Sequence, residues 1–223
     1  EMLDDYLQQP KLIVTALYSP ALERPDIHSF PVSDLVAGNM LVLQSEEEAY
    51  YRVRYPDGRE AYVKKTDALP MSDWLNGIEL SGESIVKHAL QYMGVPYLWG
   101  GTSPKGLDCS GFTKQVYFMH GIVLARDASQ QVMQGELVDS VADFSHALPG
   151  DLVFFGSKAT GDNPKERVVH VGIYMGDKRF IHASDYVRVN SFDPSDSLYD
   201  EFNTNRYLRT KRMIGKINEY YTP

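Results

Sequence analysis

Short runs of apolar and β-branched residues, separated by turn residues, fill the first 70 positions of the chain. Such runs predict strands, and they occur at KLIVTA (11–16), NMLVLQ (39–44), YYRVRY (50–55) and EAYVK (60–64). Pro56 to Gly58 predicts a tight turn, because proline fixes φ and glycine tolerates positive φ. Residues 18–34 contain three prolines and are expected to form a long polar connection. We expect residues 1–70 to form a small β-barrel, with residues 1–10 as a leading segment.

After residue 70 the hydrophobic spacing changes to a helical period and then returns to strands. Residues 71–80 are expected to be a linker that Trp74 anchors. Helices are predicted over 84–93, from Cys109 to Gly121, and after the N-cap candidate Asp127. Strands are predicted at LVFF (152–155), VVHVGIYM (168–175), RFIHAS (179–184), DYVRVN (185–190) and YLRTKRMIGKI (207–217). Helices followed by an antiparallel sheet indicate an α+β domain over residues 81–223.

The charge balance excludes one class of partner. The 223 residues carry a net charge of -8 with one short cationic run at 209–212, so no nucleic acid partner is expected. No apolar run is long enough to cross a bilayer, and the N-terminus lacks a signal-peptide pattern. Because the chain begins at Glu1, the sequence leaves open that a signal, a lipid anchor or an upstream segment has been removed. No Cys/His cluster has zinc-site spacing and no phosphate-binding glycine loop follows a strand, so we expect no metal and no other cofactor.

The single cysteine, Cys109, is the first candidate for chemistry. A loop rich in glycine and proline precedes it and a helical pattern follows, so we expect the thiol in the first turn of a helix. Unpaired N–H groups and the helix dipole favour a thiolate there. Asp108 and Ser110 flank the cysteine, and Tyr97 and Trp99 lie upstream, where they are expected to form the wall of a pocket. The alternative is a structural role, because a free cysteine is commonly a small buried apolar side chain.

Two of the six histidines, His170 and His182, lie in predicted strands that a tight turn near Asp177 joins. A connection of three or five residues would centre the pairing on Asp177 and place His182 opposite Gly172, on the same face as His170. A connection of even length would put the two histidines on opposite faces. In the first register, His170 could take the thiol proton while His182 orients it, which makes a Cys-His-His triad possible. The alternative is that each histidine is an ordinary member of a half-buried sheet.

Five segments occur in an order and spacing that resemble a known family. They are PYLWGG (96–101), LDCSGF (107–112), PGDLVFF (149–155), HVGIYMG (170–176) and FIHAS (180–184). Together they resemble the NlpC/P60 cysteine peptidases, papain-like enzymes that cut bacterial cell-wall peptides. The resemblance covers about residues 81–217, and residues 11–69 resemble a bacterial SH3 (SH3b) domain. It implies a papain-like catalytic domain of helices packed on an antiparallel sheet, preceded by a small SH3-like β-barrel.

The resemblance also implies roles for single residues. It makes Cys109 the nucleophile, His170 the general base and His182 the third, orienting residue of the triad. Peptide hydrolysis through a thioester needs a thiolate, a proton shuttle and donors to the oxyanion, which these assignments supply. By the same resemblance, the residues expected to contact the substrate or the oxyanion are Tyr97, Asp108 and Ser110, beside the pocket-wall residue Trp99.

The SH3b unit and the RDASQQ segment (126–131) resemble one subgroup, the γ-D-glutamyl-L-diamino acid endopeptidases, also called dipeptidyl-peptidase VI. The subgroup implies release of L-Ala-γ-D-Glu from murein stem peptides with a free N-terminal alanine. Asp127 would then pair with the α-ammonium of the substrate. The chain departs from the subgroup pattern at Ala128, where a serine is expected, and Ser129 follows as the nearest hydroxyl.

Two other functions remain open from the sequence. One is a peptidoglycan-binding SH3b protein with an inactive catalytic domain, and the other is a cell-wall amidase or acyl transferase on the same fold. The resemblance implies peptidoglycan-derived peptides as the partner and the bacterial cell envelope as the location, whether periplasmic, secreted or lipid-anchored, with a cytoplasmic recycling enzyme as the alternative. A monomer is expected, and a further SH3b unit upstream is consistent with the subgroup.

Overall fold

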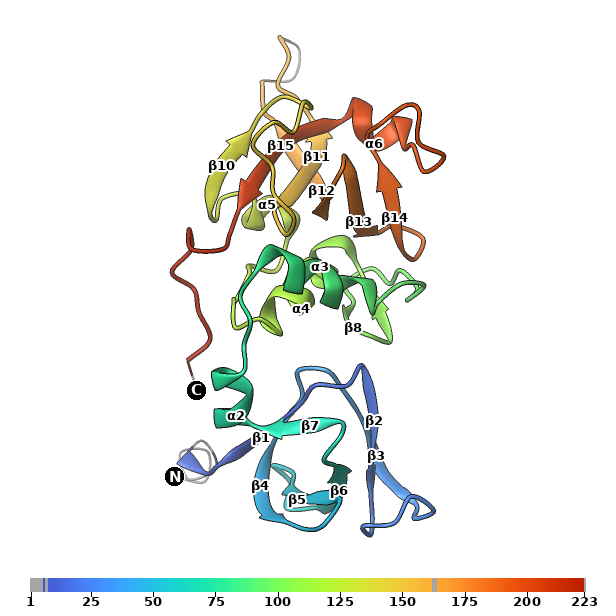
Figure 1. Cartoon of the computed structure of the whole chain (residues 1–223), viewed down its shortest axis with the longest axis vertical. Coiled ribbons are helices and arrows are strands. Elements are labelled where there is room, and N and C mark those ends of the chain that lie inside the picture. Colours follow the sequence, from blue (N-terminus) through green and yellow to red (C-terminus); the bar gives the residue numbers. More distant parts are fainter. Residues whose placement is uncertain (1–5, 7, 162–163, 223) are drawn as a thin grey trace. The chain divides into compact units, whose positions relative to one another are not determined.

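The computed structural model describes residues 6, 8–161 and 164–222 (Figure 1). The contacts within the chain divide it into two compact units between Ile78 and Glu79, inside the interval expected to be a linker. Of the leading segment expected over residues 1–10, residues 1–5 and 7 lie outside the described residues. No helix in the described part of the chain is long and apolar enough to span a membrane.

The first unit is an antiparallel sheet that wraps around an apolar core. Its strands are β1 (Lys11–Val14), β2 (Tyr18–Leu22), β3 (Pro31–Val36), β4 (Met40–Glu46), β5 (Tyr50–Arg54), β6 (Glu60–Lys64) and β7 (Ala68–Pro70). They are hydrogen-bonded in the order β3-β2-β6-β5-β4-β1-β7. Alternate side chains point inward, and Leu12, Ala21, Leu35, Val53 and Val63 belong to one buried cluster. The strands predicted at 11–16, 39–44, 50–55 and 60–64 are confirmed.

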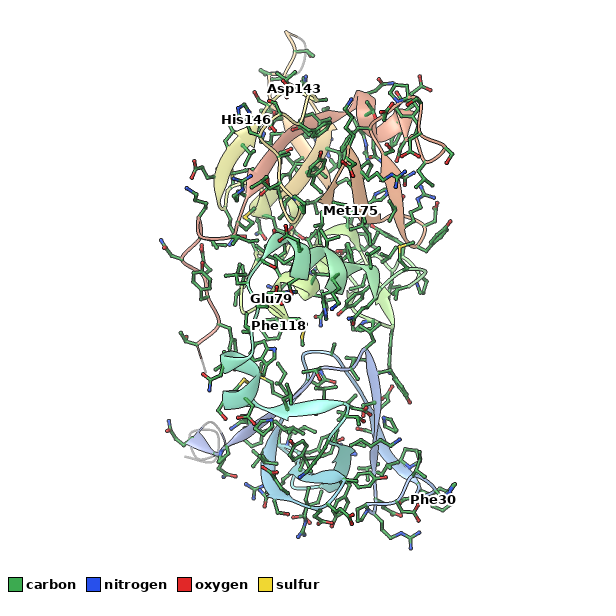
Figure 2. All side chains as sticks on the ribbon, viewed as in Figure 1. Phe30, Glu79, Phe118, Asp143, His146 and Met175 are labelled. Atoms are coloured by element: carbon green, nitrogen blue, oxygen red, sulfur yellow. The ribbon has the colours of Figure 1, made fainter. Side chains whose placement is uncertain are left out.

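The long polar connection expected over residues 18–34 is wrong, because most of it forms the paired strands β2 and β3. A polar residue hides the pattern: Ser19 is fully buried and its hydroxyl donates to Asp67 at 2.8 Å, so it occupies a core position that an apolar side chain would mark. Only residues 23–30 connect the two strands. Phe30, 77% exposed, lies at the outer end of this hairpin (Figure 2).

A short helix, α2 (Met71–Asn76), occupies most of the interval expected to be a linker. It contacts β1 and β7 of the first unit, and Trp74 is buried. The anchoring role expected of Trp74 is therefore met from within a helix. Six residues are too few to show a helical period in a sequence. A helix this short is not stable by itself and depends on tertiary contacts.

The second unit packs helices against an antiparallel sheet. Its helices are α3 (Gly82–Leu90), α4 (Cys109–Phe118), α5 (Ala128–Gln131) and α6 (Glu201–Asn205). Its strands are β8 (Thr102–Ser103), β9 (Gly106–Leu107), β10 (Glu136–Asp139), β11 (Leu152–Ser157), β12 (Arg167–Gly176), β13 (Arg179–Ala183), β14 (Val187–Ser191) and β15 (Tyr207–Arg212). The main sheet has the order β10-β15-β11-β12-β13-β14, and β8 pairs with β9 separately. The expected α+β layout is confirmed.

Helix α4 packs against β12 and β13, which brings the start of the helix to the two strands that carry the histidines (Figure 1). An aromatic cluster lies beneath those histidines, with Phe155, Phe180 and Phe192 among its buried members. The ring centroids of Phe155 and His170 are 5.6 Å apart, and those of Phe180 and His182 are 4.9 Å apart. The cluster removes water from this side of the histidines, which matters for their charge.

Candidate active site

Cys109 is the first residue of α4, as the sequence predicts. Asp108 is the N-cap, and its Oδ1 accepts a hydrogen bond from the Gly111 N–H at 2.7 Å. Gly111 has to be glycine, because a Cβ there would lie 2.0 Å from the carbonyl oxygen of Gly101. This close approach presses the loop before β8 against the first turn of the helix. The thiol is thereby fixed at the junction of the loop and the helix.

The carboxylate of Asp108 holds that junction together. Besides Gly111, it accepts from the Gly100 N–H at 3.0 Å and from the Ser110 hydroxyl at 3.3 Å. The Arg126 guanidinium donates to both of its oxygens. Burial alone would raise the pKa of Asp108, but Arg126 and the N–H donors hold it below its ordinary value. Asp108 is thus an ionised structural centre of the site, and its contact with the substrate stays a prediction.

The thiol of Cys109 differs from the sequence-based expectation of a thiolate. Its residue is only 8% exposed, and burial, followed by the charge of Asp108, raises the pKa of the thiol above its ordinary value. Hydrogen bonds from the N–H groups of Val171, Ser110 and Cys109 itself work in the opposite direction but are smaller. The helix start therefore does not by itself ionise the thiol. A base has to take its proton.

The two strand histidines are the candidates for that base. β12 and β13 pair with Ile173 opposite Ile181, and continuing this register places Gly172 opposite His182. The turn residues Asp177 and Lys178 both have positive φ, as in a two-residue hairpin turn, and a bulge before Gly176 restores the register that an odd-length connection would give. Of the two arrangements that the sequence left open, the structure has the one in which both histidines share one face.

His170 and His182 are hydrogen-bonded to each other through Nε2 of His170 and Nδ1 of His182, at 2.6 Å. Gly172 makes room for this contact, since a Cβ at that position would lie 3.1 Å from the Cβ of His182. Burial lowers the pKa of His170 well below its ordinary value, and burial lowers the pKa of His182 to about 4. Both imidazoles are neutral at pH 7, so His170 can accept a proton.

One cavity of about 490 Å³ joins most of the residues singled out from the sequence. Its walls include Tyr97, Trp99, Asp108, Cys109, Ser110, Asp127, Ser129 and His170. His182 is not among them; it is fully buried and lies behind His170. The cavity is within the size range of sites for small ligands. Cys109 and His170 therefore line the same space, while His182 has no contact with it.

The cavity wall also contains Arg126, a charged residue that the sequence patterns miss. Its Nη1 lies 3.1 Å from both Asp108 Oδ1 and the Ser110 hydroxyl. A single arginine before an N-cap has no distinguishing pattern, because its partner is 18 residues away in the chain. The neighbouring Asp127 is exposed at the N-cap of α5, as predicted, and its N–H donates to the side chain of Gln130 at 3.1 Å.

Helix α5 is tied to α4 by a buried glutamine. Gln131 accepts from the Thr113 hydroxyl at 2.8 Å and donates to the carbonyl oxygens of Ser110 and Ala125, each at 3.0 Å. This side chain holds α5, and with it Asp127 and Ser129, in the wall of the cavity. Ala128, which stands where a serine is expected, is buried in the same wall and brings no hydroxyl. Among the described residues, no group of three or more His, Cys, Asp or Glu side chains could hold a metal ion.

The arrangement suits acyl transfer through a thioester. A buried thiol, a neutral imidazole in the same cavity and a second imidazole bonded to the first supply a nucleophile, a base and a group that orients the base. The N–H of Cys109 at the start of α4 has no acceptor within the helix and lies beside the sulfur, so it can donate to an oxyanion that forms there.

Comparison with known proteins gives the family. The NlpC/P60 family model matches residues 94–212. A γ-D-glutamyl-L-lysine dipeptidyl-peptidase of Bacillus cereus is 36% identical over 64% of this chain and 40% of its own. A dipeptidyl-peptidase 6 of Lysinibacillus sphaericus is 27% identical over 87% of this chain and 69% of its own. The crystal structure of an NlpC/P60 family protein from Bacillus cereus superposes with a TM-score of 0.78 at 29% identity, over 95% of this chain and 65% of that one.

The similarity to the Bacillus cereus structure extends through the N-terminal antiparallel sheet as well as the α+β domain. The chain spans less than half the length of the Bacillus cereus dipeptidyl-peptidase that it matches. The family model covers more than half of the chain and includes both the cysteine and the two strand histidines. The chain belongs to the NlpC/P60 family.

Proposed function

We propose that this protein is a cysteine peptidase that hydrolyses the bond between γ-D-glutamate and the diamino acid of bacterial cell-wall stem peptides. The observation that carries the proposal is the cavity that a buried thiol, Cys109, and a neutral imidazole, His170, both line, with His182 bonded to Nε2 of His170. The names of the relatives supply the substrate class: γ-D-glutamyl-L-lysine dipeptidyl-peptidase and dipeptidyl-peptidase 6.

In the first half of the reaction, His170 takes the proton of the Cys109 thiol as the sulfur attacks the γ-carbonyl carbon of D-glutamate. The carbonyl electron pair moves onto oxygen, where the Cys109 N–H at the helix start can donate to it. The C–N bond then breaks, and the α-amine of the diamino acid leaves with the proton from His170. A thioester between Cys109 and L-Ala-γ-D-Glu remains.

In the second half, water gives a proton to His170 and attacks the thioester carbon. Collapse of this intermediate releases L-Ala-γ-D-Glu as the free acid and returns the proton to the sulfur. In both halves His182 acts on the reacting groups only through its bond to His170, so it orients the base. The raised pKa of Cys109 and the lowered pKa of His170 mean that the resting pair is a thiol and a neutral imidazole.

Asp127 supports a preference for peptides with a free N-terminal alanine. Its carboxylate is exposed in the cavity wall, where an ammonium group could form a charge-assisted hydrogen bond. Ser129 is the hydroxyl next to it, since Ala128 has none. The cavity volume of about 490 Å³ suits an acyl group the size of a dipeptide.

The test is product analysis with two pairs of synthetic peptides. L-Ala-γ-D-Glu-L-Lys and L-Ala-γ-D-Glu-meso-diaminopimelate are compared with the same peptides acetylated at the alanine, and products are identified by mass spectrometry. We expect L-Ala-γ-D-Glu from the free peptides, and at least a tenfold lower kcat/KM for the acetylated ones because the ammonium is lost. Cleavage elsewhere in the peptide, or transfer of the acyl group to an added amine in place of hydrolysis, would contradict the proposal.

Stem peptides of this kind are components of the cell wall, so we propose the bacterial cell envelope as the place of action. Fractionation of cells that express the full-length protein, followed by immunoblotting, tests this. Recovery with the envelope or the medium is expected, and recovery in the cytoplasmic fraction alone would favour a recycling enzyme.

A further inference from the structure

Asn190, on β14, is hydrogen-bonded to the nitrogen of His182 that faces away from His170. His182 Nε2 lies 2.9 Å from Asn190 Oδ1, and Asn190 Nδ2 lies 3.1 Å from the carbonyl oxygen of Leu198. We infer that Asn190 is a positioning residue. Held by the Leu198 carbonyl, it determines which atom donates and which accepts in the bonds from Asn190 to His182 and from His182 to His170. The inference rests on the proposed peptidase function only for what this direction of donation accomplishes.

The hydrogen bonds join the Leu198 carbonyl, Asn190, His182 and His170 in sequence, and only the carbonyl cannot exchange donor and acceptor roles. A main-chain carbonyl oxygen only accepts, so the Asn190 atom that faces Leu198 has to be the amide nitrogen. The amide oxygen therefore faces His182, and because it only accepts, His182 Nε2 has to carry a hydrogen. A neutral imidazole has one N–H, so Nδ1 of His182 is a bare acceptor. His170 Nε2 must then carry the hydrogen in the 2.6 Å bond between the rings.

This direction decides what His170 can do. With the hydrogen on Nε2, the neutral His170 has its free electron pair on Nδ1, and it can receive the proton of Cys109. In the opposite direction, Nδ1 would already carry the hydrogen, and His170 could not act as a base without first changing tautomer. After proton transfer, the Nε2–H still donates to the bare nitrogen of His182, so the same arrangement stabilises both states of His170.

The Leu198 carbonyl is itself firmly placed. It also accepts from the Ser191 N–H at 2.8 Å, which joins it to the end of β14. The Leu198 N–H donates to Asp196 Oδ1 at 3.0 Å, and Asp196 is paired with Arg179 on β13 at 2.8 Å. The loop that carries Leu198 is thus bonded to β13, which carries His182, and to β14, which carries Asn190. Asn190 transmits a fixed main-chain orientation to two buried rings.

Two variants separate positioning from a structural role. Asn190→Asp and Asn190→Leu both remove the amide that donates to Leu198, but only the aspartate keeps an acceptor for His182. On L-Ala-γ-D-Glu-L-Lys we expect Asn190→Leu to lower kcat by roughly 10²-fold with little change in KM, since a base held in the wrong tautomer loses at least this much. Asn190→Asp should stay within about tenfold of the wild type. Equal losses in both variants, in step with their melting temperatures, would overturn the inference.

A second measurement needs no substrate. Nitrogen-15 NMR of the full chain labelled at histidine reports which ring nitrogen carries the hydrogen. At pH 7 we expect the hydrogen on Nε2 in both His170 and His182, and a mixture of tautomers at His182 in Asn190→Leu. A hydrogen on Nδ1 of His182 in the wild type would refute the inference, whatever the enzyme hydrolyses. The expected tautomers in a chain that cleaves none of the peptides would instead refute the proposed function and leave the inference standing.

Discussion

His182 is bonded to His170 at 2.6 Å yet has no surface in the cavity that His170 and Cys109 share. In the proposed mechanism, His170 therefore acts on the thiol and His182 acts only on His170. Because both are buried over an aromatic cluster, their burial determines their charge as well as their orientation.

Activity should persist well below the pH at which an ordinary histidine becomes protonated. Burial, the neighbouring His182 and the charges of Arg206 and Arg188 lower the pKa of His170 far below 6.5, so the base is still neutral at pH values well below 6.5. Burial raises the pKa of Cys109 above 9.0, so the thiol keeps its transferable proton up to that pH. We expect a broad plateau in kcat/KM between these limits, and an acid limb centred at pH 6.5 would contradict this.

The stability of the second unit should fall as the pH falls from 6.5 towards 4. The pKa of His182 is about 4 in the folded chain against 6.5 for an unperturbed histidine, so the unfolded chain binds more protons in this interval. Stability from the neutral ring is complete above pH 6.5 and is lost below it at about 1.4 kcal/mol per pH unit for such a group. Urea unfolding at pH 7 and pH 5 measures this. His182→Asn should flatten the slope, and an unchanged slope would contradict the buried neutral ring.

Arg126→Lys should damage the site more than an equivalent change at another ion pair. The guanidinium bonds both oxygens of Asp108, and an ammonium cannot reproduce that geometry. We expect a loss of about 1 kcal/mol in the unfolding free energy, given the partial exposure of the pair, and a clear fall in kcat because Asp108 holds the start of α4. Arg209→Lys is the matched control, because this guanidinium also donates to both oxygens of a carboxylate, Glu166, and neither residue lines the cavity. Equal effects of the two variants would contradict the role given to Arg126.

Gly111→Ala should disrupt the junction of the loop and α4. The new methyl group would lie 2.0 Å from the Gly101 carbonyl, so the loop or the helix has to shift. We expect a loss of stability of about 1–3 kcal/mol together with a loss of activity. Gly161→Ala is the control, because nothing lies within 4 Å of a Cβ at that position. Full activity in Gly111→Ala would show that this close approach is not needed.

The helix at Cys109 and the N-cap at Asp127 could be predicted from the sequence, because each depends on residues close together in the chain. The β12–β13 register was left open, because a bulge before Gly176 decides it. β2 and α2 could not be predicted: Ser19 fills a core position through its bond to Asp67, and the short α2 depends on contacts with β1 and β7. Most of the predicted site residues that line the cavity lie in the short motifs PYLWGG, LDCSGF and RDASQQ, which can be found in the sequence without knowing the fold.

What the sequence missed in the site depends on distant partners or on burial. Arg126 binds Asp108, which lies 18 positions away in the chain. The role inferred for Asn190 depends on its bond to the Leu198 carbonyl, which only the folded structure shows. The charge of the thiol was expected from the helix start alone, but burial and Asp108 outweigh that effect. Burial is a property of the folded chain, so no local pattern could have revealed it.

The most direct test compares the wild type with Cys109→Ala on L-Ala-γ-D-Glu-L-Lys, with release of L-Ala-γ-D-Glu measured by mass spectrometry. Circular dichroism and the melting temperature establish that the variant is folded. The thiol is the only nucleophile assigned in the cavity, so we expect the wild type to release the dipeptide and the variant to fall by at least roughly 10⁴-fold. Release by a folded Cys109→Ala protein at a rate near that of the wild type would contradict the account.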